Sequence, residues 1–158
     1  MRIFKHLLSS VTLLCVCTLS YADTISGKIV AVMDGDTVKM LTHENREIKI
    51  RLAEIDAPEK AQAFGQASKK SLSDMSYGKE AKAQCSGSDK YDRYICTIFV
   101  NGVNVNNMQV SLGYAWVYRQ YATKGTKLYD AESLAKSMQS GLWADDRPVP
   151  PWEFRRTN

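Results

Sequence analysis

Apolar and polar residues alternate through much of the first half of the chain. In the clearest case Ile48, Ile50 and Leu52 alternate with charged residues, as in a strand with one buried face. Short clusters of turn residues separate three such runs. We therefore predict a meander of three strands at Thr24–Val32, Thr37–Leu41 and Arg46–Ile55. Two further runs predict a hairpin of strands Lys79–Cys85 and Tyr94–Val100.

A helical period of apolar residues replaces the alternation in three other stretches. The predicted helices lie near Ala63–Tyr77, after the Asn101-Gly102 turn, and near Lys127–Ser140. Gly78, Gly113 and Gly141 stand where these helices would end. The residues expected on their buried faces are Phe64, Ala67, Ser71, Leu72 and Met75, then Val105, Met108 and Leu112, then Leu128, Ala131, Leu134, Ala135 and Met138.

These elements define an α+β fold. Five strands with three helices outside them suit a small OB-fold-like Greek-key barrel, an architecture that commonly binds oligonucleotides on one face. The tail contains Pro148, Pro150 and Pro151, which predict an extended segment because proline cannot continue a helix.

Residues 1–22 have the features of a secretory signal peptide. Arg2 and Lys5 precede an apolar run, and Ala22 closes a small-x-small cleavage site. We expect cleavage after Ala22, which leaves 23–158 as a single domain, secreted or periplasmic and free of the membrane. A retained N-terminal anchor is the alternative. Cleavage lowers the formal net charge from +4 to +2, and such a balance permits nucleic-acid binding without indicating it.

Two cysteines, Cys85 and Cys96, remain after cleavage. They flank the turn of the predicted hairpin, and an exported chain meets an oxidising compartment. We therefore predict a cross-strand disulfide between them. Two free buried thiols are the alternative.

The residues with candidate chemistry gather in two segments. In the first, Arg51 lies on a strand that leads into Asp56 and Glu59 and stops at Pro58. In the second, Asp36 belongs to an acidic turn upstream. If the two segments pair in one sheet, the acids meet beside a guanidinium. Carboxylates so placed can hold a divalent cation, while the guanidinium neutralises a phosphate.

Each of these residues also has a purely structural interpretation. Asp34 and Asp36 could be turn formers around a Gly35 with positive φ, and for Asp34 this interpretation is preferred. Arg51 could form a surface ion pair, and Glu59 could be an acid at a helix start. The conjunction of all these residues favours catalysis.

Three motifs together resemble the staphylococcal (micrococcal) nuclease family, the thermonucleases. They are Asp34-Gly-Asp-Thr-Val38, Arg51-Leu-Ala-Glu-Ile-Asp-Ala-Pro-Glu59 and Asp89-Lys-Tyr-Asp-Arg93. Each motif alone is common, but all three occur in the family's order and at compatible spacing. The resemblance extends through Ala115-Trp-Val-Tyr118 and the last predicted helix.

The resemblance implies a role for each matching residue. Ca²⁺ would be bound by the carboxylates of Asp36 and Asp56 and by the backbone carbonyl of Ala57, where the best-known member has threonine. Glu59 would act as general base or orient the attacking water. The residues implied to bind the substrate are Arg51 and Arg93 at the phosphate, and Tyr91, Tyr118 and Trp116 at the nucleotide. Asp92 departs from the family's frequent glycine, either weakening phosphate binding or reshaping the turn.

The implied activity is Ca²⁺-dependent cleavage of DNA and RNA with little sequence preference. Single-stranded or locally melted substrates would be favoured, and cleavage of the P–O5′ bond would leave 3′-phosphate ends. We expect a monomer without a stable protein partner. Two alternatives are a nucleic-acid-binding module without chemistry and a Ca²⁺-stabilised structural domain. Lys124, Lys127, Arg155 and Arg156 are interpreted as solvated charges, with contact to nucleic acid as the alternative.

Overall fold

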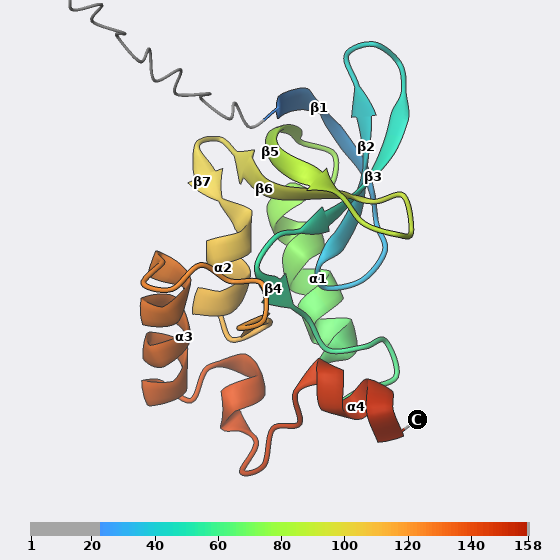
Figure 1. The fold of residues 1–158 in the computed structure, drawn as a ribbon. Coiled ribbons are helices and arrows are strands. Elements are labelled where there is room, and N and C mark those ends of the chain that lie inside the picture. The colour runs from blue at the N-terminus through green and yellow to red at the C-terminus, as the bar shows by residue number, and fades with distance from the viewer. Residues whose placement is uncertain (1–22, 158) are drawn as a thin grey trace, which may run out of the picture.

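The computed structural model describes residues 23–157, so the predicted signal segment lies outside the described residues. Five strands close into a barrel (Figure 1). They are β1 (Asp23–Val32), β2 (Thr37–Thr42), β3 (Glu47–Leu52), β5 (Glu80–Ser88) and β6 (Tyr94–Val100). Neighbours in the order β3-β2-β1-β5-β6 are antiparallel, and a parallel pairing of β3 with β6 closes the barrel. The predicted barrel and α+β class are confirmed.

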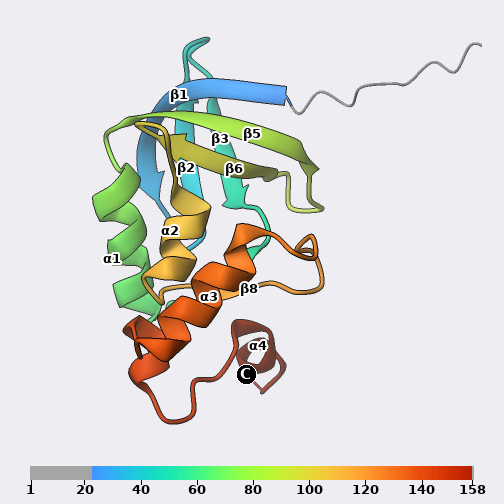
Figure 2. The same cartoon turned by 90° about the vertical axis from the view of Figure 1, so that its left-hand side faces the viewer.

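Helices lie beside and below the barrel, as Figure 2 shows from the side. Their bounds are Gly65–Ser76 for α1, Val105–Ser111 for α2, Lys127–Ser137 for α3, Gly141–Ala144 for the 3-10 helix η1 and Pro151–Thr157 for α4. Helices α1 to α3 were predicted, and α4 is additional. Within residues 23–157, no helix combines the length and the apolar character needed to cross a membrane.

The prediction of an extended tail is wrong from Pro151 onward, because α4 begins there. Proline fixes φ near its helical value and lacks only an N–H that the first turn does not use, so it starts a helix readily. The N–H of Glu153 donates to the Pro150 carbonyl at 3.0 Å, which closes the first turn.

Several residues predicted on buried helix faces are exposed instead: Ala67 in α1, Leu112 after α2, and Leu134 and Met138 at the end of α3. In α1 the buried stripe consists of Gly65, Ser68, Leu72 and Ser76, so only Leu72 contributes a large apolar side chain to the core. In α3 the buried stripe includes Glu132, which accepts a hydrogen bond from the Val117 N–H at 3.0 Å. Leu128, Ala131 and Ala135 of the predicted face are buried, so the apolar stripe does give the orientation of this helix, and Glu132 is an unpredicted member of the buried face.

The predicted third strand is also too long. It ends at Leu52, and Glu54 takes a positive φ of 64° that turns the chain away from the barrel. A separate strand β4 (Ile55–Asp56) follows and pairs with β8 (Trp116–Val117). This break places Asp56 at the edge of the barrel rather than within β3.

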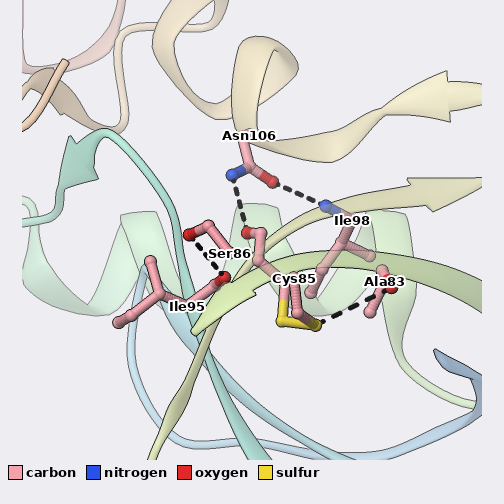
Figure 3. Close-up of a disulfide and its surroundings, with 7 residues drawn as sticks. Ala83, Cys85, Ser86, Ile95, Ile98 and Asn106 are labelled. Carbon is pink, nitrogen blue, oxygen red and sulfur yellow. Dashed lines mark hydrogen bonds between the residues drawn. A yellow bond between two sulfur atoms is a disulfide. The ribbon is translucent and has the colours of Figure 1, made fainter. Parts of the chain in front are cut away.

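Cys85 and Cys96 face each other across β5 and β6 and are joined by the predicted disulfide (Figure 3). The strand before the turn is longer than predicted and runs to Ser88, with an irregular register between Cys85 and Gly87. The turn that carries Arg93 is therefore tied covalently to the barrel wall at its base.

Candidate active site

The two acidic segments converge although they are far apart in the sequence. Strands β2 and β3 pair in a register that sets Thr37 opposite Arg51, and the Leu52 N–H donates to the Asp36 carbonyl at 2.8 Å. The Ala57 N–H donates to Oδ2 of Asp36 at 2.8 Å. Strand pairing and this hydrogen bond to the side chain together bring the Asp36 carboxylate to the segment that carries Asp56.

Arg51 lies between the two aspartates and pairs with both. One guanidinium nitrogen, Nη1, contacts Oδ2 of Asp36, and Nη2 donates to Oδ1 of Asp56 at 2.8 Å. The Arg51 side chain is 13% exposed, the Asp56 side chain 1%. Burial alone would lower the pKa of Arg51, but the two carboxylates outweigh burial and raise it above its ordinary value. Arg51 is therefore a permanent, preorganised positive charge.

Asp34 and Gly35 have different local roles. The Asp34 carboxylate accepts from the Asp36 N–H at 3.1 Å, as a turn former does. Burial and the nearby Asp36 charge raise the pKa of Asp34. Gly35 does not have the positive φ that a left-handed turn would need. It is required by close approach, because a Cβ there would come within 1.9 Å of the Ser68 Oγ.

Helix α2 holds both acidic segments through two buried amides. Asn106 accepts from the Ile98 N–H at 3.0 Å and donates to the Cys96 carbonyl at 3.1 Å (Figure 3). It also donates to the Ala53 carbonyl at 3.0 Å. Gln109 donates to the Gly35 carbonyl at 2.7 Å. One amide fixes the approach to Asp56 and the other fixes the turn before Asp36. Sequence reasoning missed both residues.

The loop after β5 carries the second predicted arginine. Arg93 donates to Oδ2 of Asp89 through Nε at 2.9 Å and through Nη2 at 2.7 Å. Burial would raise the pKa of Asp89, but the hydrogen bonds from Arg93 outweigh it and lower that pKa. Asp92 takes a left-handed φ of 57°, which explains a glycine preference at this position. The ring of the exposed Tyr91 lies against the Arg93 guanidinium, 5.4 Å from ring centroid to Cζ.

An unexpected third arginine reaches the acids from the last helix. Arg155 donates to Oδ2 of Asp56 at 2.8 Å and to Oε1 of Glu59 at 2.8 Å. The interpretation of Arg155 as a solvated charge is therefore wrong. Burial raises the pKa of Asp56, although Arg155 and Arg51 both act to lower it.

These side chains line one open cleft with a volume of about 1210 Å³. The predicted site residues that it brings together are Asp36, Arg51, Asp56, Ala57, Glu59, Tyr91, Arg93 and Tyr118. Trp116 does not line this cleft. It is 8% exposed and packs edge-on against Trp143 and Trp152, with ring centroids 4.3 and 5.8 Å away.

The donor set of the cleft fits a hard divalent cation. Within the described residues, no group of three or more His, Cys, Asp and Glu side chains is arranged to hold a metal ion. The carboxylates of Asp36 and Asp56, however, both contact the Arg51 guanidinium, and the Ala57 backbone N–H donates to the Asp36 carboxylate. Ca²⁺ takes carboxylate, carbonyl and water oxygens together, so it can use this set. The side chains that would hold it are those of Asp36 and Asp56.

The molecule is a small barrel whose cleft combines acids and guanidinium groups. The comparisons with known proteins identify its family. The profile of staphylococcal nuclease homologues matches residues 49–145. An uncharacterized endonuclease of Haemophilus influenzae is 45% identical over 82% of this chain and 72% of its own. A micrococcal nuclease of Shigella flexneri is 32% identical over 84% of this chain and 81% of its own. The chain belongs to the staphylococcal nuclease family, and it is a hydrolytic nuclease.

Proposed function

We propose that this nuclease is a Ca²⁺-dependent endonuclease that hydrolyses DNA and RNA with little sequence preference. The observation that supports this most directly is the pairing of Arg51 with both Asp36 and Asp56. It sets a fixed positive charge beside two buried carboxylates, and a phosphodiester substrate with a divalent cation needs both kinds of group. The names of the relatives from Haemophilus influenzae and Shigella flexneri support nuclease chemistry.

The cation would be held by the carboxylates of Asp36 and Asp56 and by the carbonyl of Ala57, and when bound it supplies electrostatic stabilisation of the phosphoryl oxygens. The protein's own part is to hold the carboxylate oxygens of Asp36 and Asp56 in place. The hydrogen bond from the Ala57 N–H to Asp36 and the burial of Asp56 limit the freedom of both carboxylates. Their geometry therefore costs little reorganisation during turnover.

Glu59 takes the proton from the attacking water in this proposal. It lies at the mouth of the cleft, 41% exposed, three residues after Asp56. As the water oxygen bonds to phosphorus, the P–O5′ bond breaks and the leaving O5′ takes up a proton from solvent, so the products are a 3′-phosphate and a 5′-hydroxyl. Arg51 and Arg93 oppose the negative charge that accumulates on the phosphoryl oxygens. Fixed donors of this kind are each worth on the order of 10²–10³ in rate.

Aromatic residues at the cleft suit a base that is not paired in a duplex. Tyr91 is 65% exposed and Tyr118 lines the same cleft. Stacking of a base on an aromatic ring tolerates any sequence. We therefore propose that single-stranded or locally melted nucleic acid is preferred. In this proposal Trp116 packs against Trp152 and does not touch the base.

We further propose that the chain is exported, with 1–22 removed. The composition of 1–22 supports export, and the disulfide between Cys85 and Cys96 suits an oxidising compartment. The mass of the protein recovered from its natural host should correspond to a chain that begins at Asp23.

The test is digestion of plasmid DNA and of RNA by the purified 23–158 protein, with end-group analysis. We expect cleavage of both with Ca²⁺, loss of cleavage in excess EGTA, recovery on adding Ca²⁺ back, and 3′-phosphate ends. Parallel additions of Mg²⁺ and Mn²⁺ test the preference for Ca²⁺. Full activity in EGTA would exclude the cation requirement, and 5′-phosphate ends would exclude the proposed bond cleavage.

A further inference from the structure

Arg155 occupies the oxygens that the proposed cation would need. Its Nη2 donates to Oδ2 of Asp56 at 2.8 Å, and its Nη1 lies 3.3 Å from Oδ1 of the same carboxylate and 2.8 Å from Oε1 of Glu59. Oδ1 of Asp56 also accepts from Arg51. Both oxygens of a buried carboxylate are therefore paired with guanidinium groups.

The helix that carries Arg155 is seated by several contacts. Pro151 is buried, and the Trp152 ring stacks on Tyr118 with centroids 5.6 Å apart and planes 3° apart. Just before the helix, the Val149 carbonyl accepts from the Gln62 side chain at 2.6 Å. Arg155 therefore reaches the acids from a helix that is packed against the rest of the domain.

The buried negative charge of Asp36 and Asp56 explains why a second positive group is needed beside them. Asp36 and Asp56 are 6% and 1% exposed, and a buried carboxylate without a positive partner is strongly disfavoured. Arg51 alone is shared by both aspartates, so it leaves one negative charge unbalanced. Arg155 supplies the missing charge and also pairs with Glu59. A divalent cation bound by Asp56 would supply the same charge and would repel the guanidinium.

We propose that Arg155 is an internal counter-cation that competes with Ca²⁺ for Asp56. This inference rests on the proposed cation site. Without the ion, Arg155 holds Asp56 and Glu59; when the ion binds, the guanidinium leaves Asp56 and Glu59 is released with it. Because coupling between two binding events is reciprocal, Arg155 lowers the affinity for Ca²⁺ and Ca²⁺ weakens the hold on Arg155. Arg155 is thus a residue that sets the cation affinity of the site.

The direct test is a calorimetric Ca²⁺ titration of the 23–158 protein, without substrate. We expect Arg155→Ala to lower the Kd for Ca²⁺ about tenfold, because a charge-assisted, bidentate pair no longer has to be broken. Arg155→Lys keeps the charge but loses the planar guanidinium, so its Kd for Ca²⁺ should lie between those of the wild type and Arg155→Ala. Arg156→Ala is the matched control, because Arg156 is exposed on the same helix and its substitution removes the same charge. The Kd of this variant for Ca²⁺ should stay within about twofold of the wild-type value.

Thermal unfolding supplies a second readout. Without Ca²⁺, Arg155→Ala should melt at a lower temperature than Arg156→Ala, and saturating Ca²⁺ should remove that difference. Equal Ca²⁺ affinities for the wild type and Arg155→Ala would overturn the competition and leave the cation site standing. An absence of Ca²⁺ binding in every variant would overturn both, and Asp56→Asn, which should abolish binding, shows that the measured site is this one.

Discussion

The carboxylate of Asp36 accepts a hydrogen bond from the backbone N–H of Ala57 at 2.8 Å, across 21 residues of sequence. This bond joins the two acidic segments through a main-chain group, so it depends on the fold and not on a bound ion. The proposed cation oxygens are therefore positioned before any ion arrives. The remaining freedom in the cleft lies in longer side chains such as Glu59, which is 41% exposed.

The proposed base gives the first prediction. Glu59→Gln keeps the shape of the side chain but removes the proton acceptor, so we expect kcat to fall by about 10²–10⁴ with little change in substrate affinity. Glu54→Gln is the control, because Glu54 lines the same cleft and its amide could still accept from the Thr123 N–H. The measurement is single-turnover cleavage alongside binding to a short oligonucleotide. Wild-type turnover in Glu59→Gln would remove Glu59 from the chemistry.

Arg93 gives the second prediction. Arg93→Ala should reduce the rate by about 10²–10³, because one of two guanidinium groups proposed to face the phosphate is lost. Arg93→Lys should recover only part of this, since an ammonium cannot form the planar fork. The neighbouring Lys90→Ala should retain most of the activity, although Lys90 also lies over the Tyr91 ring. If Lys90→Ala reduced the rate as much as Arg93→Ala, the loop would act through its total positive charge and not through a specific contact of Arg93 with the phosphate.

Residues of the first acidic segment and of β3 could be predicted because local rules and tertiary structure agree there. Alternation marked Ile48, Ile50 and Leu52, which are 8%, 0% and 1% exposed. Proline chemistry at Pro58 did not locate the end of β3, which is at Leu52, because the break comes from the positive φ of Glu54. Pairing of β2 with β3 brings Asp36 beside Arg51, but the final position of Asp56 also depends on β4, which pairs with β8 far along the sequence.

The long-range contacts lacked such a signal. Arg155 lies 99 residues after Asp56, and nothing near it in the sequence indicates that α4 returns to the cleft. For Gly35 the local interpretation was a positive φ, whereas the requirement comes from Ser68 on another element. Gln109 shares a helix face with the apolar Val105, four positions earlier, but that spacing does not by itself indicate a buried amide.

Asn106 gives the third prediction. Asn106→Ala should lower the free energy of unfolding by about 2–4 kcal/mol, because it leaves the buried Ile98 N–H and the Ala53 carbonyl without this partner. The Cys96 carbonyl loses one of its two donors and keeps the Ala53 N–H at 2.8 Å. Asn107→Ala, on the next residue of the same helix, should cost less than about 1 kcal/mol, since its side chain makes only a weak contact with Ser111. Urea denaturation measures both. Equal losses would mean that the buried amide has no special role.

The disulfide gives the fourth prediction. Replacing both Cys85 and Cys96 with alanine should lower the free energy of unfolding by about 3 kcal/mol, as expected for closure of a short loop, plus the loss of buried sulfur. Adding a reductant should then destabilise the wild type but leave the double variant unchanged. A wild type that is insensitive to reductant under denaturing conditions would show that the two thiols are not joined in solution.

Asp34 gives the fifth prediction, and its sign follows from the direction of its pKa shift. Burial and the nearby Asp36 charge raise the pKa of Asp34 in the folded state above its unfolded value. The fold therefore disfavours the ionised carboxylate: no penalty exists below the unfolded pKa, and the penalty grows as pH rises through the folded pKa. Asp34→Asn retains an oxygen that can accept from the Asp36 N–H.

Asp34→Asn should consequently stabilise the fold at pH 7, and this gain should vanish as the pH falls below about 4, the ordinary pKa of an aspartate. Urea denaturation of the variant and the wild type across this range, without added Ca²⁺, measures the difference. Asp74→Asn is a suitable control because Asp74 is exposed and pairs only with Lys70 at 2.6 Å among the acids and bases of α1. A gain that persists unchanged at low pH would show that charge at Asp34 is not its cause.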